Sequence, residues 1–256
     1  MHNKADMTLV TSPQMKEEME ANGVSRVEVW RKGVDTEVFN PAFKSEAMRA
    51  ELSDGHPEDP LLIYVGRLGS EKRLQDLREV LGAIPEARLA IVGKGPAEAE
   101  LKDLFKGVPR VKFMGTMQGD PLSQAFASAD IFVMPSDSET LGEPHLGPLV
   151  SCCPSSSFSA HIPLWLVAHL GFVVIESMAS GTPVVGARAG GIPSIINDGK
   201  TSLLANPRDP KDFTEKVPRK VPMLDSADMA LVRSAKWMLY SAYDTSLRLL
   251  FHGICL

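Results

Sequence analysis

The 256-residue sequence is poor in cysteine and in aromatic residues, and charge of neither sign predominates. Its three cysteines include the adjacent pair Cys152 and Cys153, which is poorly placed to bridge. A disulfide framework is therefore not expected, and a reducing compartment fits better. The 27 Lys and Arg residues stand against 32 Asp and Glu and are scattered along the chain. This balance argues against a nucleic-acid partner.

Long hydrophobic runs are also missing. The longest apolar run covers fourteen residues, 162–175, and is interrupted by Pro163 and His169. A membrane-spanning helix needs about eighteen or more, so no span is expected. The first residues lack the basic and apolar layout of a signal peptide, and no plastid transit peptide is expected in this chain. With 44% hydrophobic residues, the chain can bury the core of one large or two small domains.

Short apolar runs alternate with helical segments up to about residue 217, when residues 143–171 are set aside. Such alternation predicts an α/β fold with a doubly wound parallel sheet of the Rossmann type, whose ligand lies across the carboxyl ends of the strands. The expected strands are Val27–Trp30, Leu61–Val65, Leu89–Val92, Val111–Met114, Ile131–Met134 and Val184–Ala187. The expected helices are one from Ser12-Pro13 to Gly23, then Leu74–Leu81, Ala97–Lys106, Pro121–Ala127 and Val173–Ala179.

Glycine-rich turns follow three consecutive strands of the expected sheet, and all three turns lie on one rim. Glycines let the backbone approach a ligand closely, and Arg67 and Lys72 bring two positive charges to this rim. Because an anion there would also meet helix amino termini, the pattern predicts a phosphate site. Solvated loop charges and ordinary turns are the alternative for any one of these residues alone. The rim residues are Gly66, Arg67, Lys72, Gly93, Gly95, Pro96 and Gly115.

Two glutamates form the second part of the expected site. Glu139 follows the strand at Ile131–Met134, and Glu176 lies in the helix at Val173–Ala179. When the 29 residues 143–171 are set aside, seven residues separate the two glutamates, so both carboxylates can face one ligand. A carboxylate accepts hydrogen bonds from a diol, which suits Glu176 to ribose hydroxyls and Glu139 to the hydroxyls of a sugar.

The backbone amides near Gly142 and Phe172 would meet the phosphate between these two groups. A capping acid plus an exposed helix residue is the alternative reading of the glutamates. A metal site at Asp137 and Glu139 is disfavoured because the pair has no third ligand. A nicotinamide site is disfavoured as well, because the 93–95 turn lacks the third spaced glycine of that motif.

Together these motifs resemble the donor-binding half of the family-four retaining glycosyltransferases, enzymes with two Rossmann-like domains in the GT-B arrangement. Within that family, several segments are similar to the plant and algal sulfoquinovosyltransferases. The broader resemblance rests on Gly66-Arg67 with Glu71-Lys72, on Gly93-Lys-Gly95-Pro96, on Pro135-Ser136 with Glu139, and on Glu176-Ser-Met-Ala-Ser-Gly181. The narrower one rests on Lys32-Gly-Val-Asp35, Met117-Gln-Gly-Asp120, Leu122-Ser-Gln-Ala125, Ser136–Gly142 and Ala187–Pro193.

The resemblance implies an enzyme of sulfolipid biosynthesis in the chloroplast, in peripheral association with a plastid membrane. Its donor would be a uridine diphosphate sugar, uridine diphosphate sulfoquinovose, and its acceptor a diacylglycerol-type lipid. No cofactor and no metal are implied, because two side-chain cations take the place of a metal. Arg67, Lys72 and Glu139 would be the catalytic residues. The substrate-binding residues would be Gly66, Gly93, Gly95, Pro96, Gly115, Thr140, Leu141, Gly142, Phe172 and Glu176.

The resemblance also implies a division of the chain. Residues 1–23 would be a remnant of the amino-terminal domain, residues 24–217 the donor-binding domain, and residues 218–256 a divergent tail with an amphipathic pattern. The chain would then be the carboxyl-terminal half of a two-domain enzyme, with activity impaired as it stands. A nonenzymatic nucleotide-sugar-binding fragment, or an inert truncated product, is the alternative.

The segment 143–171 interrupts the expected domain and resembles nothing in the family. It is rich in Pro, Ser, Leu and His, and its length preserves the reading frame. We therefore hypothesise a translated intron or a mistaken gene model, which sequencing of the transcript across codons 139–176 tests. A zinc site at this segment is disfavoured because its ligand spacing matches no common pattern. The zinc candidates are His145, Cys152, Cys153 and His161.

Overall fold

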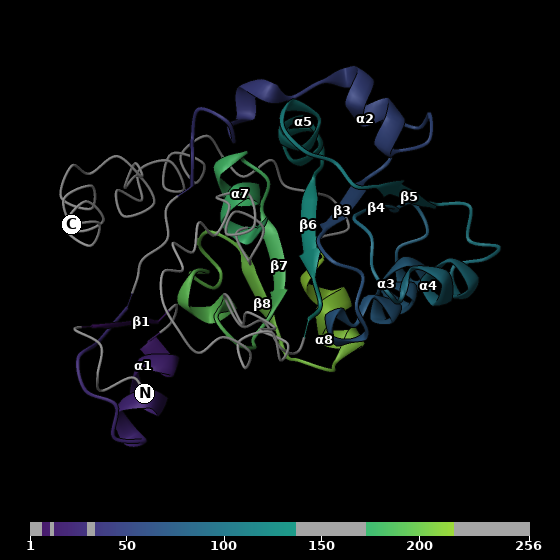
Figure 1. Cartoon of the computed structure of the whole chain (residues 1–256). Coiled ribbons are helices and arrows are strands. Elements are labelled where there is room, and N and C mark those ends of the chain that lie inside the picture. Colours follow the sequence, from purple (N-terminus) through teal and green to yellow (C-terminus); the bar gives the residue numbers. More distant parts are fainter. Residues whose placement is uncertain (1–6, 11–12, 30–33, 137–172, 218–256) are drawn as a thin grey trace, which may run out of the picture.

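A six-stranded parallel sheet forms the centre of the molecule, and helices cover both of its faces (Figure 1). The computed structural model describes residues 7–10, 13–29, 34–136 and 173–217. The strands follow the spatial order β5-β4-β3-β6-β7-β8. This confirms the doubly wound, Rossmann-like α/β fold. The strands are β3 (Leu61–Val65), β4 (Arg88–Val92), β5 (Val111–Gly115), β6 (Ile131–Met134), β7 (Val184–Ala187) and β8 (Leu203–Ala205).

The strand order reverses between β3 and β6. From β3 the chain builds outward through β4 to β5, then returns to place β6 on the other side of β3 and continues to β7 and β8. The strands that follow β3 and β6 in the chain, β4 and β7, therefore lie on opposite sides of the β3-β6 pair. In open α/β sheets, the crevice at such a switch point is where ligands bind.

Alternate residues of the strands pack on opposite faces of the sheet. Leu61, Ile63 and Val65 belong to one apolar cluster, and Leu62 and Tyr64 belong to the other. The first cluster includes side chains of α2 (Glu46–Leu52), α5 (Asp120–Ser128) and α7 (Val173–Ala179). The second includes side chains of α3 (Leu77–Ala83), α4 (Glu98–Leu104) and α8 (Pro210–Lys216). This two-faced burial explains why the central strands read as continuous apolar runs.

The amino-terminal part forms a small unit of its own. β1 (Thr8–Val10) pairs in parallel with β2 (Val27–Val29), and α1 (Pro13–Ala21) connects them. The expected strand at Val27–Trp30 is therefore wrong as a strand of the main sheet, because its hydrogen-bonding partner is β1. In the described part of the chain, no helix is long and apolar enough to cross a membrane.

Several short elements were not expected from the sequence. They are β1, α2, β8 and α8, together with the 3₁₀ helices η2 (Pro41–Phe43), η3 (Ser70–Lys72), η4 (Leu74–Asp76) and η6 (Ile192–Ser194). The expected helix at Leu74–Leu81 begins as the 3₁₀ turn η4 and continues as α3. Residues 143–171 and the amphipathic pattern beyond residue 217 lie outside the described residues.

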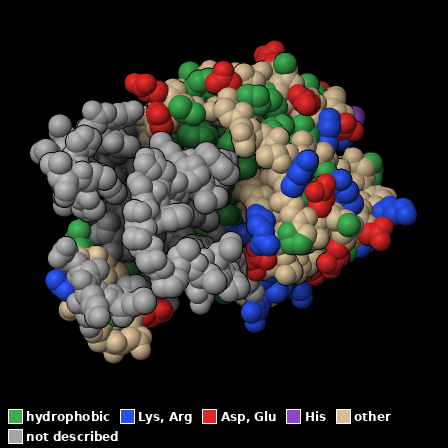
Figure 2. Space-filling view, in the orientation of Figure 1, with side chains coloured by type: hydrophobic (Ala, Val, Ile, Leu, Met, Phe, Trp, Pro, Cys, Tyr) green, Lys and Arg blue, Asp and Glu red, His purple; other side chains and the backbone are tan. Residues whose placement is uncertain are grey.

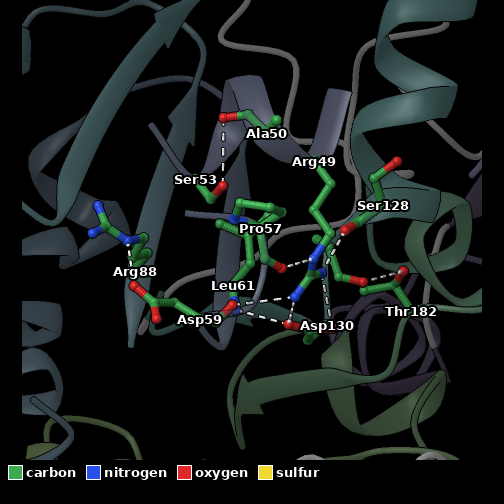
Figure 3. A network of polar contacts seen from close by, with 11 residues as sticks. Arg49, Ala50, Ser53, Pro57, Asp59, Leu61, Arg88, Ser128, Asp130 and Thr182 are labelled. Carbon is green, nitrogen blue, oxygen red and sulfur yellow. Dashed lines mark hydrogen bonds and ion pairs between the residues drawn. The ribbon is translucent and has the colours of Figure 1, made fainter. Parts of the chain in front are cut away.

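A polar network anchors α2 at the amino ends of β3 and β6 (Figure 3). Arg49 of α2 donates two parallel hydrogen bonds to the Asp130 carboxylate, at 3.0 and 2.8 Å. The same guanidinium donates to the carbonyls of Ser128 and Asp59. Asp130 also accepts the Leu61 N–H at 2.8 Å. Because charge-assisted bidentate pairs hold both groups in one geometry, this network fixes the start of both central strands.

We expect Arg49→Ala to lower the free energy of unfolding by about 2–3 kcal/mol, because the change removes the bidentate partner of the Asp130 carboxylate and the donor to three backbone carbonyls, those of Pro57, Asp59 and Ser128. Urea unfolding measures this difference. Lys102→Ala is the control, since Lys102 pairs with Glu98 at the surface with its side chain 53% exposed. That variant should lose less than about 1 kcal/mol. Equal losses in the two variants would contradict the anchoring role.

Candidate functional site

A cleft of about 660 Å³ opens at the carboxyl ends of β3, β4 and β5, beside the switch point. Turns that follow the three strands form one wall, and the first turn of α7 forms part of another. Phe39 and Leu122 contribute apolar surface. The polar and glycine residues that line the cleft are Gly66 and Arg67 after β3, Gly93 and Lys94 after β4, Thr116, Gln118 and Gly119 after β5, and Glu176 on α7.

The structure brings together four of the residues expected at the site, Gly66, Arg67, Gly93 and Glu176, which all line the cleft. Gly115 is the last residue of β5 and directly precedes the lining residue Thr116. Lys72, Gly95 and Pro96 belong to the same turns but do not line the cleft. Five expected residues lie outside the described residues, and their roles stay predictions: Glu139, Thr140, Leu141, Gly142 and Phe172.

The turns after β3 and β4 pack backbone against backbone. The Leu68 N–H donates to the Lys94 carbonyl at 3.1 Å. A Cβ atom on Gly93 would lie 1.9 Å from the Gly66 carbonyl oxygen, and Gly93 also has a left-handed φ of +137°. A Cβ atom on Gly95 would lie 2.2 Å from the Leu68 carbonyl oxygen. These two glycines thus have a packing role in addition to the expected role of admitting a ligand.

We expect Gly95→Ala to destabilise the domain by about 2 kcal/mol, because its methyl group would overlap the neighbouring turn. Gly82→Ala is a matched control: Gly82 lies in α3 with open space around its Cβ position, so alanine should stabilise by up to about 1 kcal/mol. Thermal unfolding of both variants tests the difference. A neutral effect of Gly95→Ala would contradict the close packing of the two turns.

The expected cations lie on one short turn after β3. The Arg67 side chain is 57% exposed and pairs with Glu71 at 2.8 Å. Lys72 is half-buried and ends η3, and the next residue, Arg73, has a left-handed φ of 51°. The Ser136 hydroxyl, just beyond β6, donates to the Glu71 carbonyl at 3.2 Å. The turn is thereby tied to both strands of the switch point.

Glu176 lines the cleft, and its carboxyl has a pKa displaced from the ordinary value. It is half-buried on α7 and lines the cleft beside Val173. Burial raises the pKa of its carboxyl from the ordinary 4.5 to about 7, because the charged form loses solvation. Near neutral pH the residue therefore exchanges between an acceptor-only carboxylate and a neutral carboxylic acid that can donate.

The raised pKa of Glu176 predicts a pH dependence of stability. Folding favours the protonated form, so this residue opposes folding least below pH 4.5, and stability falls as the pH rises through about 7. We expect Glu176→Gln to be more stable than the parent at pH 8, by on the order of 2 kcal/mol, and equal to it at pH 4.5. Urea unfolding at both values tests this. Glu79→Gln, at an exposed position of α3, should show no such difference.

Sequence reasoning missed several residues of the wall. Thr116–Gly119 connect a strand to a helix on the expected rim, and that position is a signal that could have identified them. Lys94 stands between two of the expected glycines. Phe39 offered no signal, because it reaches the cleft from a segment before the main sheet, where its ring packs edge-on against Phe126 at 5.9 Å.

Positive and negative side chains alternate over the described surface shown in Figure 2 and do not form one continuous basic face. Within the described ranges, no three His, Cys, Asp or Glu side chains gather in a way that could hold a metal ion. The residues considered for zinc, and Asp137 with Glu139, lie outside those ranges. The charged side chains that line the cleft are those of Arg67, Lys94 and Glu176.

The fold and cleft define a Rossmann-like domain with a candidate ligand site at its switch point, and comparison with known proteins adds the family. The sequence model of the family Glycosyl transferases group 1 matches residues 59–147 and 149–220. The chain belongs to this family. This agrees with the resemblance inferred from the sequence motifs.

Among individual proteins, sulfoquinovosyl transferase SQD2 of Arabidopsis thaliana is 46% identical over 223 residues, which cover 85% of this chain and 38% of that protein. A GDP-mannose-dependent alpha-mannosyltransferase of Mycobacterium tuberculosis is 33% identical over 205 residues, covering 80% of this chain and 45% of that protein. The chain thus spans less than half the length of these relatives. The predicted resemblance to sulfoquinovosyltransferases is confirmed.

Solved structures support the fold. Sucrose-phosphate synthase from Thermosynechococcus elongatus superposes with a TM-score of 0.72 at 22% identity, over 99% of this chain and 59% of the other. Anabaena Alr3699/HepE, crystallised in complex with UDP and glucose, superposes with a TM-score of 0.66 at 19% identity, over 91% of this chain and 57% of the other. At such identities the likeness concerns the architecture.

Proposed function

We propose that this chain contains the donor-binding domain of a glycosyltransferase that moves sulfoquinovose from uridine diphosphate to a diacylglycerol-type lipid. The 46% identity to the Arabidopsis sulfoquinovosyl transferase carries the proposal. The cleft at the switch point supports it, because its wall combines cations, glycine turns and a carboxyl group. A similarly folded protein, Anabaena HepE, was crystallised with UDP and glucose.

In this proposal the donor diphosphate lies against the turn after β3, where Arg67 and Lys72 supply positive charge. Glu176 accepts hydrogen bonds from the ribose hydroxyls, and the backbone around Gly115 meets the base. Glu139 holds the donor sugar, and the amides near Gly142 and Phe172 meet the phosphate.

Catalysis would then depend on charge that develops as the sugar leaves. The bond between the anomeric carbon and the phosphate oxygen breaks, and the departing uridine diphosphate gains negative charge. Preorganised cations stabilise this charge more in the transition state than in the bound donor, which lowers the barrier. Loss of one such contact typically costs about 3 kcal/mol, or about a hundredfold in rate.

The proposal extends to the organisation of the whole protein. Residues 24–217 would be the donor-binding domain, and residues 1–23 the end of a preceding domain that supplies the acceptor site. Residues 143–171 would be foreign to the family and would separate the two halves of the donor site, which impairs activity. A plastid membrane would hold the lipid acceptor, with the protein in peripheral association.

Isothermal calorimetry with UDP tests donor binding. We expect weak or no binding by the chain as it stands and recovery of binding once residues 143–171 are deleted, because the deletion rejoins Gly142 to Phe172. Arg67→Ala should weaken binding by about tenfold or more through the lost charge-assisted contact. Arg78→Ala is the control, since Arg78 is an exposed cation on α3. Equal binding by the two arginine variants would contradict the assigned diphosphate site.

A transfer assay separates donor binding from enzymatic activity. Labelled uridine diphosphate sulfoquinovose and diacylglycerol would be incubated with the deleted chain joined to an amino-terminal domain from a relative. UDP binding without transfer would leave a nucleotide-sugar-binding domain and overturn the enzymatic part of the proposal.

A further inference from the structure

The turn after β3 contains an ion pair that is too exposed to contribute much to the stability of the fold. Arg67 Nη1 lies 2.8 Å from Glu71 Oε1, with the two side chains 57% and 37% exposed. Exposed pairs contribute little to folding. The spacing is that of a helical pair, yet residues 70–72 form a 3₁₀ turn and Arg73 is left-handed. The pair is therefore a product of this particular turn.

Two buried hydroxyl groups hold the backbone on either side of the pair. Tyr64 of β3 donates from its hydroxyl to the Arg67 carbonyl at 2.9 Å. Ser136 donates from its hydroxyl to the Glu71 carbonyl at 3.2 Å. Both donor residues are 0% exposed. Each member of the pair is thus anchored to one of the two strands that flank the switch point.

Gly69 leaves the space that the Glu71 carboxylate occupies. A Cβ atom at Gly69 would lie 2.2 Å from both carboxylate oxygens of Glu71. The Gly69 backbone is extended, with φ −116° and ψ 158°, a conformation that any residue adopts. A methyl group at this position would therefore require the flexible Glu71 side chain to move from its present place beside Arg67.

We propose that Glu71 is a positioning residue that orients the Arg67 guanidinium for the diphosphate of the donor. Among the described residues, this guanidinium makes one side-chain hydrogen bond, from Nη1. A guanidinium has five N–H donors, so those on Nη2 and Nε stay available to a ligand. An oriented arginine loses less conformational entropy when it binds, which raises affinity. This inference rests on the proposed function.

If Glu71 instead competed with the diphosphate for Arg67, its removal would change UDP binding in the opposite direction. As an internal anion that competes with the diphosphate, Glu71 would weaken donor binding, and its removal would tighten it. As a positioning residue it strengthens binding, and its removal matters only while Arg67 is present. The sign of the effect and its dependence on Arg67 therefore separate the two roles.

UDP titration of the full chain by calorimetry tests the inference with Glu71→Ala, Gly69→Ala, Arg67→Ala and the double variant of Arg67 and Glu71. We expect Glu71→Ala and Gly69→Ala each to weaken UDP binding by about fivefold. The double variant should bind no more weakly than Arg67→Ala alone. Thermal unfolding should be unchanged in Glu71→Ala. Glu79→Ala, an exposed acid on α3, is the charge-matched control and should leave binding unchanged.

The outcomes distinguish this inference from the proposed function. If Arg67→Ala weakens binding while Glu71→Ala has no effect, tightens binding, or adds fully to Arg67→Ala, the positioning role is overturned and the donor site stands. If the full chain does not bind UDP, the same variants are compared in the chain without residues 143–171. If neither chain binds UDP, or Arg67→Ala binds as its parent does, the proposed donor site is overturned, and the positioning role with it.

Discussion

The position of β3 between β4 and β6 is the constraint on which the rest of the domain depends. All five residues of β3 are buried, and the strand pairs in parallel with a neighbour on each side. Its first N–H, that of Leu61, is accepted by the Asp130 carboxylate, and its side chains alternate between two apolar clusters. The carboxyl end of β3 opens into the cleft, which Val65, Gly66 and Arg67 line.

The turn after β3 serves the fold and the candidate site through the same contacts. Tyr64 fills the core with its ring, and its hydroxyl holds the carbonyl of Arg67. Gly93 and Gly95 let the next turn approach closely enough for backbone hydrogen bonds. The result is a rigid rim on which an exposed arginine has a defined place. A preorganised cation of this kind suits a ligand that carries concentrated negative charge.

This architecture recurs in proteins whose sequences have little in common, as the likeness to sucrose-phosphate synthase from Thermosynechococcus elongatus at 22% identity shows. The fold therefore determines where a ligand binds, and the side chains determine which ligand binds there. Here the distinguishing side chains are the charged ones, Arg67, Lys94 and Glu176, in a lining that otherwise consists of glycines, apolar residues and the uncharged polar residues Thr116 and Gln118. The buried carboxyl of Glu176, with a pKa of about 7, adds a group whose protonation state changes near neutral pH.

The sequence by itself determined the central strands and the rim. Runs such as Leu61–Val65 and Ile131–Met134 are buried on both faces, and glycines or polar residues end them, so local composition carries the information. The turns after β3, β4 and β5 could be placed together because parallel strands bring their carboxyl ends to one edge. Gly66, Arg67 and Gly93, which line the cleft, were predicted in this way, and Glu176 was predicted from its spacing to Glu139.

Only the tertiary structure decided features that depend on distant segments. The strand at Val27–Val29 pairs with β1, and β8 is a three-residue strand without a distinctive pattern. Phe39 enters the cleft wall from an earlier segment, and Arg49 meets Asp130 across 81 positions of sequence. Burial that raises the pKa of Glu176 likewise comes from neighbours in space. Local patterns specify which residues form a strand or a turn, whereas partners, burial and pKa are set by residues that the folded chain brings together.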